Sequence, residues 1–189
     1  TSSFIVTVID NTAPVFTTCP SNISNAPINS AGCVASVNMT SPVYTDNCGV
    51  SALTWTMTGA TTASGTNTIP SPYSFNVGTT TVTYTAQDAS GNSQTCSFTV
   101  TVTNTLQASM SGTATVAVNG SAPSITFTGS GGTKPYTFTY TVNGGTPQTV
   151  STVGSNANTT VPQATSTTGQ FIYTLVSVTD AYGCSGALQ

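Results

Sequence analysis

Few side chains in this 189-residue sequence could do chemistry. The acids are Asp10, Asp46, Asp88 and Asp180, and the cation is Lys134. Three acids have amide neighbours, in Asp10-Asn11, Asp46-Asn47 and the stretch from Asp88 to Asn92. Ca²⁺ takes six to eight oxygen ligands from carboxylates, amides and carbonyls, so these acids are candidate ligands if the fold brings them together. The alternative is that they build turns through hydrogen bonds to the backbone.

The composition excludes most other chemistry. Charged residues make up 3% of the chain, and His, Glu and Arg are absent. Without histidine, Ser-His-Asp and Cys-His nucleophiles cannot form, and general acid–base catalysis loses its commonest group. A single lysine cannot neutralise a nucleic-acid backbone. We therefore expect no enzyme and no nucleic-acid partner. No stretch reaches the roughly 18 apolar residues of a membrane span.

Two residues have a functional and a plain interpretation. Lys134 could form an isopeptide bond with an asparagine, but its loop, Gly131-Gly132-Thr133-Lys134-Pro135, favours a solvated cation. Trp55 could stack on a sugar ring. It alternates with Leu53 and Met57 on a predicted strand, which favours a place in the core.

The elements that must position these residues are strands. Apolar and threonine side chains alternate with period two, as in Tyr136–Val142 and Phe98–Thr103, which predicts antiparallel sheets with one buried face. Asn143-Gly144-Gly145 predicts a type I′ hairpin turn. No segment has the periodicity and caps of a helix. The predicted fold class is all-β, as tandem immunoglobulin-like sandwiches.

A repeated strand predicts the domain organisation. Residues 1–8 and 95–102 are identical at six of eight positions, with an offset of 94 that suits one sandwich module. We expect residues 1–10 to be the last strand of a preceding module and residues 11–104 to be a complete one. We expect residues 105–189 to be a second module, with a strand near 113–118. We also expect it to lack its last strand, with an exposed edge that is filled by residues beyond the chain or by a neighbouring chain.

Residues 11–103 resemble the HYR (hyalin repeat) domain, an extracellular immunoglobulin-like module. The motifs that carry the resemblance occur in family order along the module. They are Asp10-Asn11-Thr12-Ala13-Pro14, Cys19-Pro20-Ser21-Asn22-Ile23, Gly32-Cys33, Thr45-Asp46-Asn47-Cys48-Gly49, Phe75-Asn76-Val77-Gly78-Thr79, Asp88-Ala89-Ser90-Gly91-Asn92 and Thr95-Cys96. An immunoglobulin-like topology would bring Asp46 and Asp88 to the same end, with Asp10 at the module joint, where Ca²⁺ would stiffen the chain.

The cysteines of this module allow three pairings by themselves. The HYR resemblance implies disulfides Cys19–Cys96 and Cys33–Cys48. A structural role is favoured over a redox switch. Five cysteines in an all-β, threonine-rich chain indicate an oxidising, extracellular or cell-surface location.

Residues 107–189 resemble a PKD-like or immunoglobulin-like repeat of very large Bacteroidetes surface adhesins, including those of gliding motility and type IX secretion. The matching motifs include Ile125-Thr126-Phe127-Thr128-Gly129, Asn143-Gly144-Gly145 and Ser177-Val178-Thr179-Asp180. That family often pairs a cysteine near Ala117 with the one at Cys184. Because Ala occupies that position here, we expect Cys184 to be unpaired, with a cross-link to another chain as the alternative.

The expected function is structural. The chain would be a repeat segment of a large extracellular bacterial surface protein, an adhesin, gliding or fibre-forming stalk that supplies extension, stiffness and attachment. Its partners would be neighbouring repeats, further copies, or a surface glycan or protein. The alternative is a glycan- or protein-binding module that uses loops such as 59–72 or 154–169.

Overall fold

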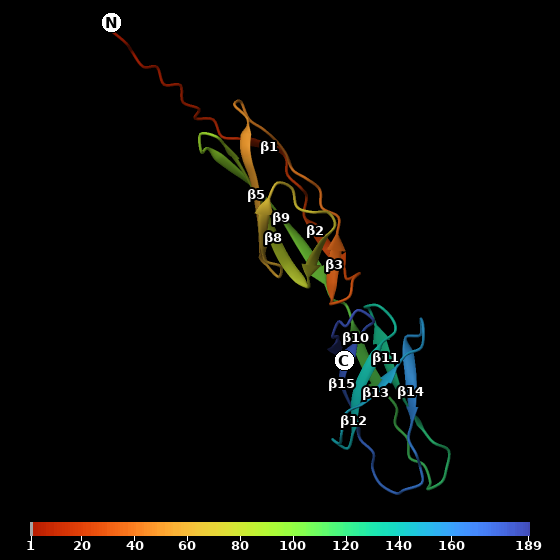
Figure 1. Cartoon of the computed structure of the whole chain (residues 1–189). Helices are drawn as coiled ribbons and strands as arrows, with labels where there is room; N and C mark the ends of the chain where they lie inside the picture. The colour runs from red at the N-terminus through yellow and green to blue at the C-terminus, as the bar shows by residue number, and fades with distance from the viewer. Residues whose placement is uncertain (1) are drawn as a thin grey trace. The chain divides into compact units, whose positions relative to one another are not determined.

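The computed structural model describes residues 2–189, in which strands are the regular secondary structure and helices are absent. The chain divides into two compact units. Unit 1 contains the described residues up to Pro27 together with Val34–Thr103. Unit 2 contains Asn104–Gln189 and also the short loop Ile28–Cys33. Each unit is a β-sandwich-like domain, which confirms the predicted fold class (Figure 1).

Unit 1 has nine strands in three sheets. They are β1 (Val15–Thr18), β2 (Ile23–Pro27), β3 (Val34–Val37), β4 (Val43–Thr45), β5 (Val50–Gly59), β6 (Ala63–Thr66), β7 (Tyr73–Asn76), β8 (Gly78–Asp88) and β9 (Ser93–Thr103). The largest sheet has the order β2-β9-β8-β5-β6. The strands β3 and β7 form a second sheet, and β1 and β4 form a third. In the large sheet β9 lies antiparallel to β8 and parallel to β2.

The core of unit 1 is built by the alternating residues of its long strands. Tyr84 and Val82 of β8 are fully buried, as are Phe98 and Val100 of β9 to within a few per cent. Trp55 of β5 packs edge to face on Tyr73 of β7, with ring centroids 6.0 Å apart. Trp55 is buried, which confirms the prediction that it belongs to the core. Gly65 is required beside it, because a Cβ there would lie 2.5 Å from the indole ring.

Unit 2 has seven strands in two sheets. They are β10 (Gln107–Ser111), β11 (Ser124–Ser130), β12 (Thr137–Val142), β13 (Gln148–Ser151), β14 (Asn158–Pro162), β15 (Tyr173–Thr179) and β16 (Ala187–Leu188). The sheet orders are β14-β11-β10-β16 and β13-β12-β15. Phe127 of one sheet packs against Phe138 and Tyr140 of the other, so the aromatic strand positions form the core between the sheets.

The predicted turn is present, but it does not close a tight hairpin. Asn143 and Gly144 both have positive φ, as in a type I′ turn, and the Gly145 N–H donates to the Val142 carbonyl at 2.9 Å. The strands β12 and β13 pair only as far as Tyr140 and Gln148, so the connection is longer than a two-residue loop.

Two predicted strands differ from the structure. Residues 113–118 form no strand, and β10 at Gln107–Ser111 begins unit 2 instead. Alternation in 113–118 is present, but a strand also needs a paired neighbour, and β11 pairs with β10. Residues 2–10 likewise form no strand, so their origin in a preceding module stays a prediction. Thr1 lies outside the described residues.

In the part of the chain that the structure describes, no helix has the length and apolar character needed to cross a membrane.

Candidate metal centre

Strand pairing in unit 1 brings Asp10, Asp46 and Asp88 to one place. The strands β1 and β4 are antiparallel with Val15 opposite Thr45, so the residues before β1 lie beside those after β4. Asp88 ends β8, and the turn to β9 carries Asn92. The Asn92 side chain donates to the Asp10 carbonyl at 3.0 Å, which ties this turn to the segment before β1.

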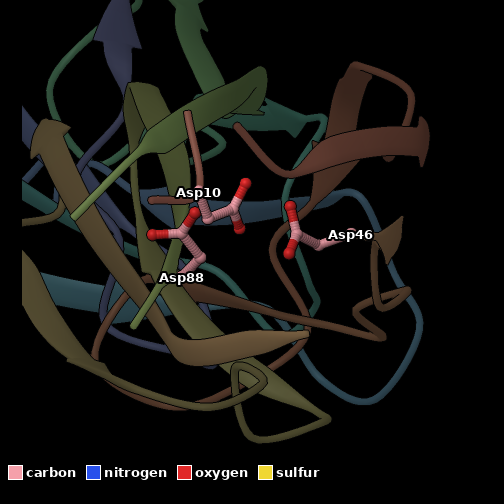
Figure 2. Close-up of side chains that lie close together, drawn as sticks. All are labelled: Asp10, Asp46 and Asp88. Atoms are coloured by element: carbon pink, nitrogen blue, oxygen red, sulfur yellow. The ribbon is translucent and has the colours of Figure 1, made fainter. Parts of the chain in front are cut away.

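The three carboxylates converge. One oxygen from each of Asp10, Asp46 and Asp88 lies within 4.8 Å of the other two. Figure 2 shows the carboxyl groups facing a common space from three separate segments of the chain. Asp88 is buried, and the other two are partly exposed. The proximity predicted from the resemblance is therefore present, and all three residues belong to unit 1.

Hydrogen bonds fix each carboxylate. Asp88 Oδ1 accepts from the backbone N–H groups of Ser90 and Asn92, both at 2.9 Å, and its Oδ2 accepts from Asn92 Nδ2 at 2.8 Å. Asp46 Oδ2 accepts from the Cys48 N–H at 3.0 Å. Asp10 Oδ1 accepts from the Thr12 N–H at 3.0 Å and from Asn47 Nδ2 at 3.1 Å. These aspartates therefore do stabilise turns through hydrogen bonds, but the bonds occupy only some of their carboxylate oxygens.

Two carboxylate oxygens remain without a partner. Asp10 Oδ2 and Asp46 Oδ1 are buried atoms that accept no hydrogen bond. A buried, unbonded carboxylate oxygen is costly, and a second and third carboxylate nearby add like-charge repulsion. Lys134, the chain's sole side-chain cation, belongs to unit 2 and donates to the Ser155 carbonyl. A hard cation would satisfy both oxygens, and a set of three carboxylates suits Ca²⁺.

The charges of this cluster affect its titratable groups. The Thr12 N–H and then the Asn47 side chain stabilise the Asp10 carboxylate, which lowers the pKa of Asp10. The pKa of Cys48 is raised, first by its hydrogen bond to Asp10 and then by the negative charge of that carboxylate. Asp10 therefore stays ionised at neutral pH, and Cys48 stays a thiol.

Cys48 joins this cluster, although the family resemblance implied that it forms a disulfide with Cys33. It is free and exposed, and Asn47 Nδ2 donates to its sulfur at 3.4 Å. Cys48 directly follows Asp46 and Asn47 in the sequence, and this adjacency could have indicated that it lies beside the carboxylates.

The disulfides of the structure are Cys19–Cys96 and Cys33–Cys184. The pairing of Cys33 with Cys48 that the resemblance implied is therefore absent, and Cys184 is not the free thiol that was expected. The physical reason is that loop Ile28–Cys33 belongs to unit 2, where the Gly32 N–H donates to the Tyr182 carbonyl at 3.0 Å. This contact brings Cys33 to Cys184. Cys48 lies instead beside Asp10, in unit 1.

In the fourth aspartate, Asp180, both carboxylate oxygens accept hydrogen bonds. Asp180 Oδ1 accepts from the N–H groups of Tyr182 and Cys184, and its Oδ2 accepts from the Thr133 N–H at 2.9 Å. Asp180 is buried in unit 2 and is a purely structural turn residue.

Comparison with known proteins gives one family and two similar structures. The model of the family described as "HYR domain" matches residues 9–102. The structure is similar to one of a 1.5-MDa bacterial ice-binding adhesin, studied for its retention on the host cell surface, with 13% identity and a TM-score of 0.43. It is also similar to a tetra-tandem repeat from the extending region of a large adhesion protein, with 19% identity and a TM-score of 0.32.

The matched regions are partial. The first similarity covers 94% of this chain and 63% of that chain, and the second covers 77% and 43%. A search of curated protein sequences found no match.

Proposed function

Because residues 9–102 are a HYR domain, we propose that this chain is a structural segment of a large extracellular bacterial surface protein, an adhesin or a fibre-forming stalk. Its role is to supply extension, stiffness and attachment, as a non-catalytic module does. The sequence supports this role because it lacks histidine, glutamate and arginine, which carry most acid–base chemistry.

The observation that carries the proposal is the path of the chain between its units. The chain passes from unit 1 to unit 2 after Pro27, returns after Cys33 and passes again after Thr103. Three covalent connections restrict bending more than one linker does. The excursion into unit 2 is closed by the Cys33–Cys184 disulfide, so it cannot be withdrawn without reduction.

The third connection, after Thr103, contains no flexible linker. The strand β9 ends at Thr103, and Asn104 Oδ1 already accepts from the Leu106 N–H of unit 2 at 3.1 Å. Leu106 is buried in the core of unit 2. A short connection whose residues are already packed is the kind that transmits force rather than absorbs it. Two disulfides also suit an oxidising, extracellular location.

We further propose that Ca²⁺ binds Asp10, Asp46 and Asp88 through the two unbonded oxygens and Asp88. Asp10 belongs to the segment that leads into β1, and Asp46 and Asp88 belong to the body of unit 1. A cation at this point would fix the entering chain to the domain. It would extend the stiffness of the segment to residues before the HYR domain.

Nuclear magnetic relaxation tests the stiff-segment proposal. We expect backbone ¹⁵N relaxation to report one common rotational correlation time for units 1 and 2. The double variant Cys33→Ser/Cys184→Ser should give the two units separate, shorter correlation times, because the loop is no longer closed. The matched control, Cys19→Ser/Cys96→Ser, removes a disulfide within unit 1 and should keep the common value. Independent tumbling of the units in the unsubstituted chain would refute the proposal.

A further inference from the structure

The tripeptide Val-Asn-Gly occurs at two places in unit 2, at residues 118–120 and at residues 142–144. In each copy the asparagine lies in a turn and has positive φ, 60° at Asn119 and 51° at Asn143. Both asparagines are exposed. Because the local sequence and the asparagine conformation are alike, a difference in the chemistry of the two copies must come from their surroundings.

An asparagine that precedes glycine can lose its side-chain amide without a catalyst. The backbone nitrogen of the glycine gives its proton to water or hydroxide and attacks Cγ of the asparagine. A bond from this nitrogen to Cγ forms, the bond from Cγ to Nδ2 breaks, and Nδ2 leaves as ammonia. Glycine favours the attack because it has no Cβ beside the attacking nitrogen. The product is a five-membered succinimide ring.

Water then opens the succinimide ring. Attack of water at Cγ gives aspartate in an unchanged main chain. Attack at the other carbonyl gives isoaspartate, in which the main chain runs through Cβ and Cγ. In total, one water molecule is consumed, one ammonia molecule is released, and an amide becomes a carboxylate. The reaction therefore needs no oxidant, no reductant and no enzyme.

The surroundings of Asn143 oppose this reaction. Asn143 Oδ1 accepts from the Ile172 N–H at 2.8 Å, and Asn143 Nδ2 donates to the Gln170 carbonyl at 3.1 Å. The Asn143 backbone N–H also donates to the Ile172 carbonyl at 2.8 Å. The turn directly follows the pair Val142–Tyr173, which joins β12 to β15. Because the attack reorients the amide and removes Nδ2, it must break both side-chain hydrogen bonds.

The side chain of Asn119 is not held in this way. In the part of the chain that the structure describes, the Asn119 amide makes no hydrogen bond. Residues 112–123 form no strand, so this turn lies within a loop. The attacking nitrogen has one restraint, because the Gly120 N–H donates to the Ala117 carbonyl at 2.9 Å. A turn hydrogen bond within a loop opens by local fluctuation, without the separation of paired strands.

We propose that Asn119 is a site of spontaneous deamidation and that Asn143, in the same tripeptide, is protected from it. Each event adds one negative charge to a chain whose formal net charge is −3. The modified turn also joins two loops. The Asn119 N–H donates to the Thr165 carbonyl at 2.9 Å, and the Thr165 hydroxyl donates to the Gly120 carbonyl at 2.8 Å. Isoaspartate lengthens the main chain between these two hydrogen bonds, so it loosens the attachment of loop 112–123 to Thr165.

Incubation of the protein in H₂¹⁸O at mildly alkaline pH tests the proposal, with mass spectrometry of chymotryptic peptides as the readout. We expect ¹⁸O-labelled aspartate and isoaspartate at position 119. Asn143 should react at least about tenfold more slowly, because the hydrogen bonds of its side chain must break. The rate at position 119 should rise with pH, since the attacking nitrogen must lose its proton. Equal rates at the two positions in the folded protein would overturn the proposal.

The denatured chain is the matched control. In guanidinium chloride both copies of Val-Asn-Gly lose their surroundings, so we expect the two rates to become comparable, chiefly through acceleration at Asn143. The proposal is also overturned if Asn119 stays intact in the folded protein over a period that converts it in the denatured chain. The variant Asn119→Gln should give no labelled product at position 119, because its longer side chain would have to close a larger ring.

Hydrogen exchange tests the structural consequence. Ion exchange separates the isoaspartate form by its added negative charge. In this form we expect faster exchange of the N–H at position 119, whose hydrogen bond to Thr165 is disturbed, and unchanged exchange of the Gly145 N–H in the other turn. Unchanged exchange at position 119 would exclude the loosening of the loop. Neither result affects the proposed stiffness or calcium site, because Asn119 belongs to neither the disulfides nor the aspartate cluster.

Discussion

Asp10 and Asp46 differ from Asp180 in one respect that decides their chemistry. Asp10 Oδ2 and Asp46 Oδ1 are buried without a hydrogen bond, whereas both oxygens of Asp180 accept backbone N–H groups. A satisfied carboxylate contributes to the turn and needs nothing more. Two carboxylate oxygens without hydrogen bonds, beside a third carboxylate, are stabilised when a cation binds to them. The same residue type therefore has a structural role in unit 2 and a ligand role, by our proposal, in unit 1.

Calcium should stabilise unit 1 through this cluster. Linkage predicts about 2.7 kcal/mol of added stability when free Ca²⁺ is about 100 times its Kd, because the ion binds only the folded cluster. Thermal unfolding with and without Ca²⁺ measures the effect, and calorimetric titration measures the binding. Asp46→Asn should abolish both.

Asp180→Asn is the control for that measurement. It changes an aspartate of unit 2 and should leave the calcium-dependent shift of unit 1 intact. A chain that shows neither heat of binding nor a shifted melting temperature would exclude the calcium site.

The turns after β8 and β15 are the same structural element in two units. Each has the sequence Asp-Ala-x-Gly, at Asp88–Gly91 in unit 1 and at Asp180–Gly183 in unit 2. In each, Oδ1 accepts the N–H groups two and four residues later. The glycine adopts positive φ, +92° at Gly91 and +81° at Gly183, where a side chain would be strained. A local motif therefore builds the same turn on both sandwiches.

Removal of the aspartate should destabilise the unit that contains it. Asp180→Ala leaves the N–H groups of Thr133, Tyr182 and Cys184 without their side-chain acceptor. Because such groups are costly when buried, we expect unit 2 to lose about 1–3 kcal/mol of unfolding free energy. Urea denaturation measures the loss. Asp180→Asn keeps one acceptor oxygen and should cost less, and an unchanged midpoint for Asp180→Ala would contradict this account.

The loop Ile28–Cys33 makes the whole molecule differ from two modules in a row. Its sequence neighbours, Pro27 and Val34, belong to unit 1, yet the loop belongs to unit 2. Cys33 reaches Cys184 across 151 residues of sequence. Closing so long a loop removes much conformational freedom from the unfolded chain, although the gain grows only slowly with loop length. The two disulfides thus lie in different units, Cys19–Cys96 in unit 1 and Cys33–Cys184 in unit 2, and they close loops of different length.

Peptide mapping without reduction checks this arrangement. We expect one cross-linked peptide pair containing Cys19 and Cys96, another containing Cys33 and Cys184, and one free thiol per chain, on Cys48. Labelling under denaturing conditions with a thiol reagent should modify Cys48 alone. A peptide joining Cys33 to Cys48 would restore the pairing implied by the family resemblance.

Local pattern was enough to predict the all-β class, the type I′ turn at Asn143-Gly144, the core position of Trp55 and the HYR domain. Alternation, turn chemistry and motif order are properties of short segments, and they need no knowledge of distant residues. The partner of Cys33, the freedom of Cys48 and the start of unit 2 at β10 depended on the tertiary structure. So did the oxygens that Asp10 and Asp46 leave unbonded. Each of these is settled by which segment lies beside another after folding, and strand neighbours and loop positions are non-local.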